Sequence, residues 1–112
     1  MKRIAAVVRP EKLEPLKEAL FEAKISGMTI YQVHGCGNQH GWKEYFRGSE
    51  VFLNMIPKVK FEIIVDDDRV DEIVDLIVSV ARTGEVGDGK IFISAIESVV
   101  RVRTGEKDEA AV

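Results

Sequence analysis

Basic residues accompany a glycine-rich segment in the last third of the chain. Residues 83–89 read Thr-Gly-Glu-Val-Gly-Asp-Gly, and Lys90 follows directly. Glycine backbone N–H groups can approach an anion closely, and lysine or arginine supplies the opposing charge. The spacing matches neither a Walker loop nor a dinucleotide fingerprint. The segment therefore predicts phosphate binding without identifying the nucleotide.

Two further pairs of cations strengthen this interpretation. Lys58 and Lys60 are two residues apart, as are Arg101 and Arg103, so each pair shares a face if its segment is a strand. A second glycine cluster, Gly-Cys-Gly, occupies residues 35–37. Taken singly, these features are typical of solvated strand edges and of an ordinary loop between a helix and a strand. Together they favour a nucleotide site.

The histidines offer weaker signals for metal binding or catalysis. His34 and Cys36 are two residues apart, but two candidate ligands without a second pair are weak evidence for a metal site. A strand histidine beside a packed cysteine is the simpler interpretation. His40 is better placed for a reactive role, although no carboxylate partner is evident. A small phosphotransfer or hydrolytic enzyme using His40 or His34 is therefore the alternative to a binding protein.

Length and composition limit the classes of protein that remain. The 112 residues predict one domain over 1–112, and 46% hydrophobic residues suffice for a core. A net charge of −3 argues against nucleic-acid binding. The single cysteine excludes an internal disulfide, and no apolar run approaches the roughly 20 residues of a membrane span. The N-terminus lacks a signal-peptide pattern, so we expect a cytoplasmic protein without direct membrane insertion.

Hydrophobic periodicity predicts a βαββαβ order. Extended segments are expected at 2–8, 28–33, 58–65, 90–96 and 99–103, and amphipathic helices at 13–23 and 70–81. Asp66, Asp67 and Asp68 predict a turn and a helix N-cap. This order indicates a ferredoxin-like α+β sandwich, with both helices on one sheet face. Because no third helix covers the other face, we expect self-association.

A long segment between the second and third strands interrupts this pattern. Residues 38–54 carry four aromatic residues, which disordered linkers avoid, namely Trp42, Tyr45, Phe46 and Phe52. A long hairpin with packed aromatics is one interpretation. Because two glycines and mixed charges make a poor strand, we favour a loop that folds against a partner.

At this point the chain resembles the PII signal-transduction family, the trimeric sensors of nitrogen, carbon and energy status. The resemblance covers nearly the whole chain. It is strongest at residues 83–93, and the ending at 101–106 agrees as well. Further agreement comes from Val8-Arg9-Pro10, Gly27-Met28-Thr29, Arg47-Gly48-Ser49-Glu50 and Pro57-Lys58-Val59-Lys60.

The resemblance implies a homotrimer with ATP or ADP bound between subunits. Phosphates would be held by Gly87, Asp88, Gly89 and Lys90, with Arg101 and Arg103 reaching across from the neighbouring subunit. Thr29, Glu62 and Ile64 would lie near the adenine and ribose. The base of the long loop, called the T-loop in this family, would be formed by Gly35, Cys36, Gly37 and Asn38.

The resemblance also implies a second ligand and a target. Gln39 would help to ligate a magnesium ion on the ATP phosphates, 2-oxoglutarate would bridge that ion, and Lys58 would pair with its distal carboxylate. The T-loop, with Arg47 at its tip, would control an ammonium channel or a nitrogen-metabolism enzyme or regulator. A channel partner would recruit the protein to the membrane.

Three positions depart from the family pattern, and a fourth position, which matches it, offers a modification site. Val51 replaces a frequent tyrosine, so nucleotidylation there is impossible, and Phe46 replaces another. Asn38 stands where a phosphate-contacting arginine is common. Ser49 matches a position that is phosphorylated in some relatives.

An RNA-binding module is a third hypothesis, because one common RNA-reading domain shares this topology. Its lysine/arginine-glycine-aromatic signature is absent from the strand candidates 28–33 and 58–65. The acidic charge balance also disfavours it.

Overall fold

The computed structural model describes residues 1–35, 42–46, 49–53 and 55–112. The strands and helices in chain order are β1 (Lys2–Val8), α1 (Leu13–Glu22), β2 (Met28–Gly35), β3 (Trp42–Phe46), β4 (Ser49–Leu53), β5 (Ile56–Val65), α2 (Val70–Ala81) and β6 (Gly89–Ala95). Short 3₁₀ helices cover Pro10–Lys12, Asp67–Arg69 and Asp108–Ala111. Within these described residues, no helix combines the length and apolar character needed to cross a bilayer.

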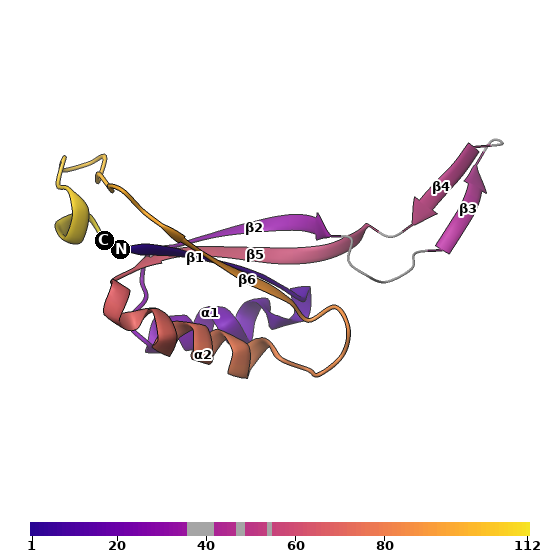
Figure 1. Ribbon diagram of the computed structural model, residues 1–112, viewed down its shortest axis with the longest axis horizontal. Helices are drawn as coiled ribbons and strands as arrows, with labels where there is room; N and C mark the ends of the chain where they lie inside the picture. The colour runs from indigo at the N-terminus through magenta and orange to yellow at the C-terminus, as the bar shows by residue number, and fades with distance from the viewer. Residues whose placement is uncertain (36–41, 47–48, 54) are drawn as a thin grey trace.

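Four strands form one antiparallel sheet, and both helices lie on the same side of it (Figure 1). The strand order is β2-β5-β1-β6, so β1 pairs with both β5 and β6. With the hairpin of β3 and β4 set aside, the chain order is β-α-β-β-α-β. The predicted ferredoxin-like α+β fold is confirmed. Among the residues described here, no helix covers the opposite face of the sheet (the open face, Figure 1).

The core lies between the sheet and the two helices. Alternate residues of β5 point toward the helices and are at most 4% exposed, namely Val59, Phe61, Ile63 and Val65. The helices contribute four side chains that are at most 1% exposed, namely Leu16, Leu20, Ile73 and Ile77. The other residues of β5, among them Lys58, Lys60 and Glu62, therefore lie on the open face.

The predicted strand at 99–103 is wrong. Only Val100 forms a bridge, and its partner is Lys107 rather than a strand of the sheet. The Arg101 N–H donates to the Glu106 carbonyl at 2.8 Å, and the Gly105 N–H donates to the Arg101 carbonyl at 2.8 Å. Gly105, at φ 73°, reverses the chain directly after the alternating Val-Arg pattern. Valine and arginine do alternate in this segment, but the turn pairs it with residues 106–108 instead of with the sheet.

The expectation that residues 38–54 make a poor strand is also wrong in part. Residues 42–46 and 49–53 form a two-stranded antiparallel sheet, with Trp42 opposite Leu53 and Phe46 opposite Ser49. Two residues separate the strands, which is a common length for a hairpin connection. Aromatic and β-branched residues favour extended backbone, and here they outweigh the mixed charges.

The aspartates before α2 act differently from a side-chain N-cap. Asp66 begins the predicted turn, but its carboxylate makes no capping hydrogen bond. Asp67 instead accepts a hydrogen bond from the N-terminal ammonium group at 2.8 Å, which lowers the pKa of its carboxyl. Asp67 is therefore paired with the N-terminal charge, and the predicted side-chain cap by Asp66 does not form.

The core supports a direct test at two adjacent positions of α1. Leu20→Ala should lower the free energy of unfolding by about 3 kcal/mol, because it removes a fully buried side chain and leaves a cavity. Phe21 is 52% exposed, and Phe21→Ala should cost less than about 1 kcal/mol. Urea denaturation at one fixed protein concentration measures both. Equal losses would contradict the assignment of the core.

Candidate functional site

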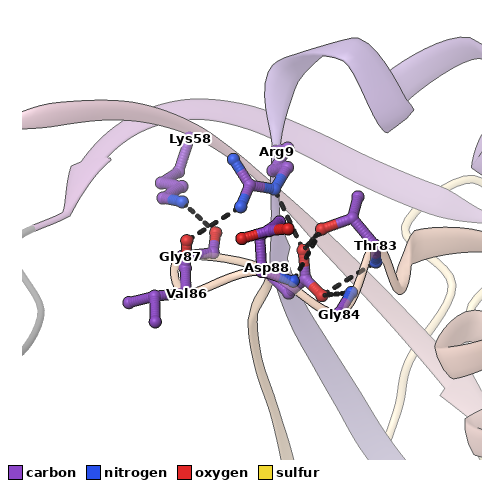
Figure 2. Close-up of polar contacts among 8 residues, drawn as sticks. Arg9, Lys58, Thr83, Gly84, Val86, Gly87 and Asp88 are labelled. Atoms are coloured by element: carbon purple, nitrogen blue, oxygen red, sulfur yellow. Dashed lines mark hydrogen bonds and ion pairs between the residues drawn. The ribbon is translucent and has the colours of Figure 1, made fainter.

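The Asp88 carboxylate organises the glycine loop, residues 83–89, that joins α2 to β6 (Figure 2). One oxygen, Oδ1, accepts hydrogen bonds from Arg9 Nε at 3.0 Å and from the Thr83 hydroxyl. The other, Oδ2, accepts from the backbone N–H groups of Thr83 and Gly84, both at 2.8 Å. The Thr83 hydroxyl and N–H, followed by Arg9, hold the pKa of the Asp88 carboxyl far below its ordinary value of 3.8. The carboxylate is therefore ionised and fully engaged within the loop.

The loop also depends on glycine backbone conformations. Gly84, Gly87 and Gly89 have φ angles of 90°, 99° and 108°, which side chains rarely adopt. At Gly89 a Cβ atom would lie 1.7 Å from the Val7 carbonyl oxygen, so the loop joins the sheet where only glycine fits. These residues determine the path of the chain from Thr83 to Lys90.

Two cations hold successive carbonyl groups of the loop. Arg9 Nη2 donates to the Val86 carbonyl at 2.8 Å, and Lys58 Nζ donates to the Gly87 carbonyl (Figure 2). Because the peptide bonds are trans, the N–H groups of Gly87 and Asp88 point away from the carbonyls that the cations hold. Backbone N–H groups of a glycine loop that are not directed at its own carbonyl partners are the kind of donor that phosphate-binding loops use.

Arg9 and Thr83 are the residues that sequence reasoning missed. The pairing of Val8 with Gly89 places the residue after β1 beside the residue before β6, so Arg9 meets Asp88. No spacing in the sequence reveals this contact, because it depends on which strands pair and in which register. The sequence pattern includes Thr83 only as the first residue of the glycine loop and indicates no role for its hydroxyl.

The glycine loop lies at one end of the sheet with several predicted residues (the loop end). Lys58 reaches the loop from β5, and Lys90, the second residue of β6, lies opposite Val7. Gly35 ends β2, where an added Cβ would touch Lys58 Cγ at 3.5 Å. The structure therefore brings Gly35, Lys58, the loop glycines and Lys90 together.

The remaining predicted residues lie at the opposite end of the sheet (the cavity end). Thr29 and Glu62 face each other across β2 and β5, and Ile64 is two residues further along β5. Ile64 and Arg101 line a cavity of about 370 Å³, together with Gly27, Lys24, Asp66 and Arg69. Arg103 belongs to the adjacent turn, and both arginines follow β6 in the chain.

Among the described residues, a single chain therefore does not bring the whole predicted site together. The chain runs through β6 from Gly89 at the loop end to Ala95, and seven residues of strand span roughly 20 Å. Figure 1 shows the loop after α2 at one end of the sheet and both chain termini at the other. The glycine loop and the two arginines therefore lie at opposite ends of the sheet.

The chain matches a known family along almost its whole length. A family model described as Nitrogen regulatory protein P-II matches residues 1–106. The chain belongs to this family. Proteins named Nitrogen regulatory protein P-II from Synechocystis sp. and Nostoc punctiforme are each 54% identical over 112 residues, covering all of both chains. Nitrogen regulatory protein P-II 1 of Escherichia coli is 50% identical, also over the full length.

Membership in the P-II family confirms the resemblance drawn from the motifs. Each of these relatives is named a regulatory protein, which favours a regulator of nitrogen metabolism over a phosphotransfer or hydrolytic enzyme. Among the residues that the structure describes, no group of three or more His, Cys, Asp or Glu side chains could hold a metal ion. His34 lies in β2, whereas Cys36, the other candidate ligand considered with it, is outside the described residues.

Part of the predicted T-loop is also outside the described residues, namely Cys36, Gly37, Asn38, Gln39, His40 and Arg47. The backbone of β3 and β4 carries the predicted partner-binding and modification positions, namely Trp42, Tyr45, Phe46, Ser49 and Phe52. Their side chains are not among the described parts. The assignments at these positions stay predictions.

The loop geometry predicts how Asp88 titrates. Thr83→Val keeps the side-chain shape but removes the hydroxyl donor, so the pKa of Asp88 should rise toward 3.8. A depressed carboxyl pKa contributes stability that is present above 3.8 and lost as pH falls through the folded-state value. In Thr83→Val this stabilising contribution should be smaller, and its loss should be complete at a higher pH.

Carboxyl ¹³C NMR titration of Asp88 measures this shift. Ser79→Ala is the matched control, because its hydroxyl bonds the Leu76 carbonyl within α2. An unchanged Asp88 titration in Thr83→Val would show that the hydroxyl does not hold the carboxylate.

Proposed function

We propose that this P-II protein is a non-catalytic sensor of ATP, ADP and 2-oxoglutarate that acts as a homotrimer and controls target proteins through residues 38–54. The observation that carries the proposal is the division of the candidate site between the two ends of the sheet. The loop end offers backbone N–H groups and lysines suited to phosphates. The cavity end offers a cavity, the Glu62 carboxylate and the Thr29 hydroxyl, which suit a nucleoside. It also offers Arg101 and Arg103, whose positive charge suits phosphates.

A closed ring of identical subunits would join the two ends. In such a ring the loop end of one subunit faces the cavity end of the next, and each interface holds one complete site. Gly87, Gly89 and Lys90 would contact phosphates from one side, with Arg101 and Arg103 from the neighbour. Because the Asp88 side chain is anionic and engaged, its part would be to shape the loop and present its backbone N–H.

Lys58 would connect the loop to the second ligand. Its ammonium group has three N–H donors, and one of them binds the Gly87 carbonyl. The others would pair with the distal carboxylate of 2-oxoglutarate. Magnesium prefers oxygen ligands in octahedral geometry, and Gln39 would supply one of them. ADP lacks the γ-phosphate oxygen that helps to complete this shell, so 2-oxoglutarate should bind well only with Mg-ATP.

The location of Lys58 would let ligand binding reach the target-binding segment. Lys58 is the third residue of β5, and Gly35 beside it is the last residue of β2. β2 therefore ends, and β5 begins, next to this position. We propose that an ammonium channel, or an enzyme or regulator of nitrogen metabolism, binds Trp42, Tyr45, Phe46, Arg47 and Phe52. In this proposal the protein is cytoplasmic and reaches the membrane through such a channel.

Calorimetry tests the proposed coupling between the ligands. The affinity for 2-oxoglutarate should be at least about tenfold higher with Mg-ATP than with Mg-ADP. Lys58→Ala should abolish 2-oxoglutarate binding but spare ADP binding. Lys17→Ala, which removes a surface lysine paired with Glu14 on α1, serves as the control. Equal binding of 2-oxoglutarate with either nucleotide would refute the coupling.

Mixing of variants tests whether the site lies between subunits. Lys90→Ala and Arg101→Ala should each weaken ATP binding, because each damages a different half of every site. When the two are unfolded together and refolded as a mixture, about a quarter of the interfaces in a random cyclic trimer should regain both halves. The double variant Lys90→Ala/Arg101→Ala, refolded with itself, should regain none. Absence of recovery in mixed trimers would place the site within one chain.

A further inference from the structure

A closed cluster of three polar side chains occupies the open face of the sheet at Glu62. The Tyr31 hydroxyl donates to Glu62 Oε2 at 2.6 Å, and Lys60 Nζ lies 3.1 Å from Glu62 Oε1. Lys60 Nζ also lies 5.4 Å from the centre of the Tyr31 ring, within the range of a cation–π contact. Each oxygen of the carboxylate thus has its own partner, and the two partners contact each other.

The surroundings keep Glu62 ionised. Tyr31 faces it from β2, Lys60 from its own strand β5 and Arg3 from β1. The Tyr31 hydrogen bond, followed by Lys60, lowers the pKa of the Glu62 carboxyl below its ordinary value of 4.5. The same hydrogen bond raises the pKa of Tyr31, so the phenol remains the donor at neutral pH.

A structural role alone explains this arrangement poorly. The side chains of Lys60 and Glu62 are 32% and 20% exposed, and ion pairs in contact with water add little stability. An ionised carboxylate can accept about four hydrogen bonds, and the cluster uses two of them. Thr29, another residue of the cavity end, lies directly opposite Glu62 in the register, so the carboxylate keeps acceptor capacity beside that half of the candidate site.

We propose that Tyr31 is a positioning residue that, together with Lys60, holds the Glu62 carboxylate in place to accept a hydrogen bond from the nucleoside of a bound nucleotide. This inference rests on the proposed function, because it assumes that the nucleoside lies at the cavity end. The donor is an N–H of the base or a hydroxyl of the ribose, the two kinds of donor that an adenine nucleoside carries. Tyr31 belongs to none of the motifs that indicated the nucleotide site.

Tyr31→Phe is the decisive variant, because it keeps the aromatic ring and removes only the hydroxyl. Its affinity for ATP should fall about threefold to tenfold, the usual effect of losing one hydrogen bond. Ser94→Ala is the matched control, since it removes a hydroxyl from β6 on the same sheet face, where Ser94 pairs with Arg3. In a Glu62→Gln background, Tyr31→Phe should cause no further loss, because the phenol acts through the carboxylate.

Two analogues identify the donor. Inosine triphosphate lacks the exocyclic amine of ATP, and 2′,3′-dideoxy-ATP lacks both free hydroxyls of the ribose. The analogue that lacks the group bound by Glu62 should have the same affinity for the wild-type protein and for Tyr31→Phe. If Tyr31→Phe weakens the binding of both analogues as much as it weakens the binding of ATP, Glu62 does not bind the nucleoside and the inference is wrong.

The outcomes separate this inference from the proposed function. Failure of the wild-type protein to bind ATP overturns the proposed function and the inference together. Wild-type binding with unchanged affinity in Tyr31→Phe overturns the inference alone. An equal loss in the Glu62→Gln background, or dissociation of the oligomer by light scattering, also overturns it, because Tyr31 would then act through packing or assembly.

Discussion

The hydrogen bonds to the Asp88 carboxylate are the contacts on which the candidate site depends. Three glycines with positive φ give residues 83–89 more conformational freedom than an ordinary loop, and that freedom must be restricted before the loop can bind a ligand. One ionised side chain does this by accepting hydrogen bonds from Thr83, Gly84 and Arg9. Charge-assisted hydrogen bonds suit the task because they are stronger than neutral ones.

The register of the central strand decides which side chains reach this loop. Val8 at the end of β1 pairs with Val59 of β5 on one side and with Gly89 of β6 on the other. Lys58 and Asp88 are the neighbours of those partners, so both lie beside Arg9. A shift of one residue would move Arg9 away from Asp88 and turn the apolar face of β1 outward. Core packing therefore maintains the loop as well as the fold.

These particular contacts also show what the sequence could predict. Alternation in 59–65 and the apolar stripe of 70–81 identify buried faces, because local periodicity reflects local burial. The loop, Lys58 and Lys90 were identified by composition and by family resemblance. Arg9 and Tyr31 were missed because their roles depend on strand register, which no local pattern records. The errors at 99–103 and 42–53 have different causes. At 99–103, alternation shows that a segment is extended without showing which segment it pairs with. At 42–53, glycines and mixed charges argued against a strand, although aromatic and β-branched residues favour one.

In the proposed assembly, the contact between Lys58 and Gly87 makes coupling between the two ligands a local effect. An acid that pairs with Lys58 and a phosphate that binds the loop would act on bonded neighbours, so no long route through the protein is required. By reciprocity, each ligand would strengthen the other by the same factor. Lys58 also lies beside Gly35, where an added Cβ would touch its side chain, so a shift of Lys58 would act where β2 ends and where β5 begins. Because β3 pairs with β4, such a shift would reorient a hairpin that is already paired, and a target would have less chain to order on binding.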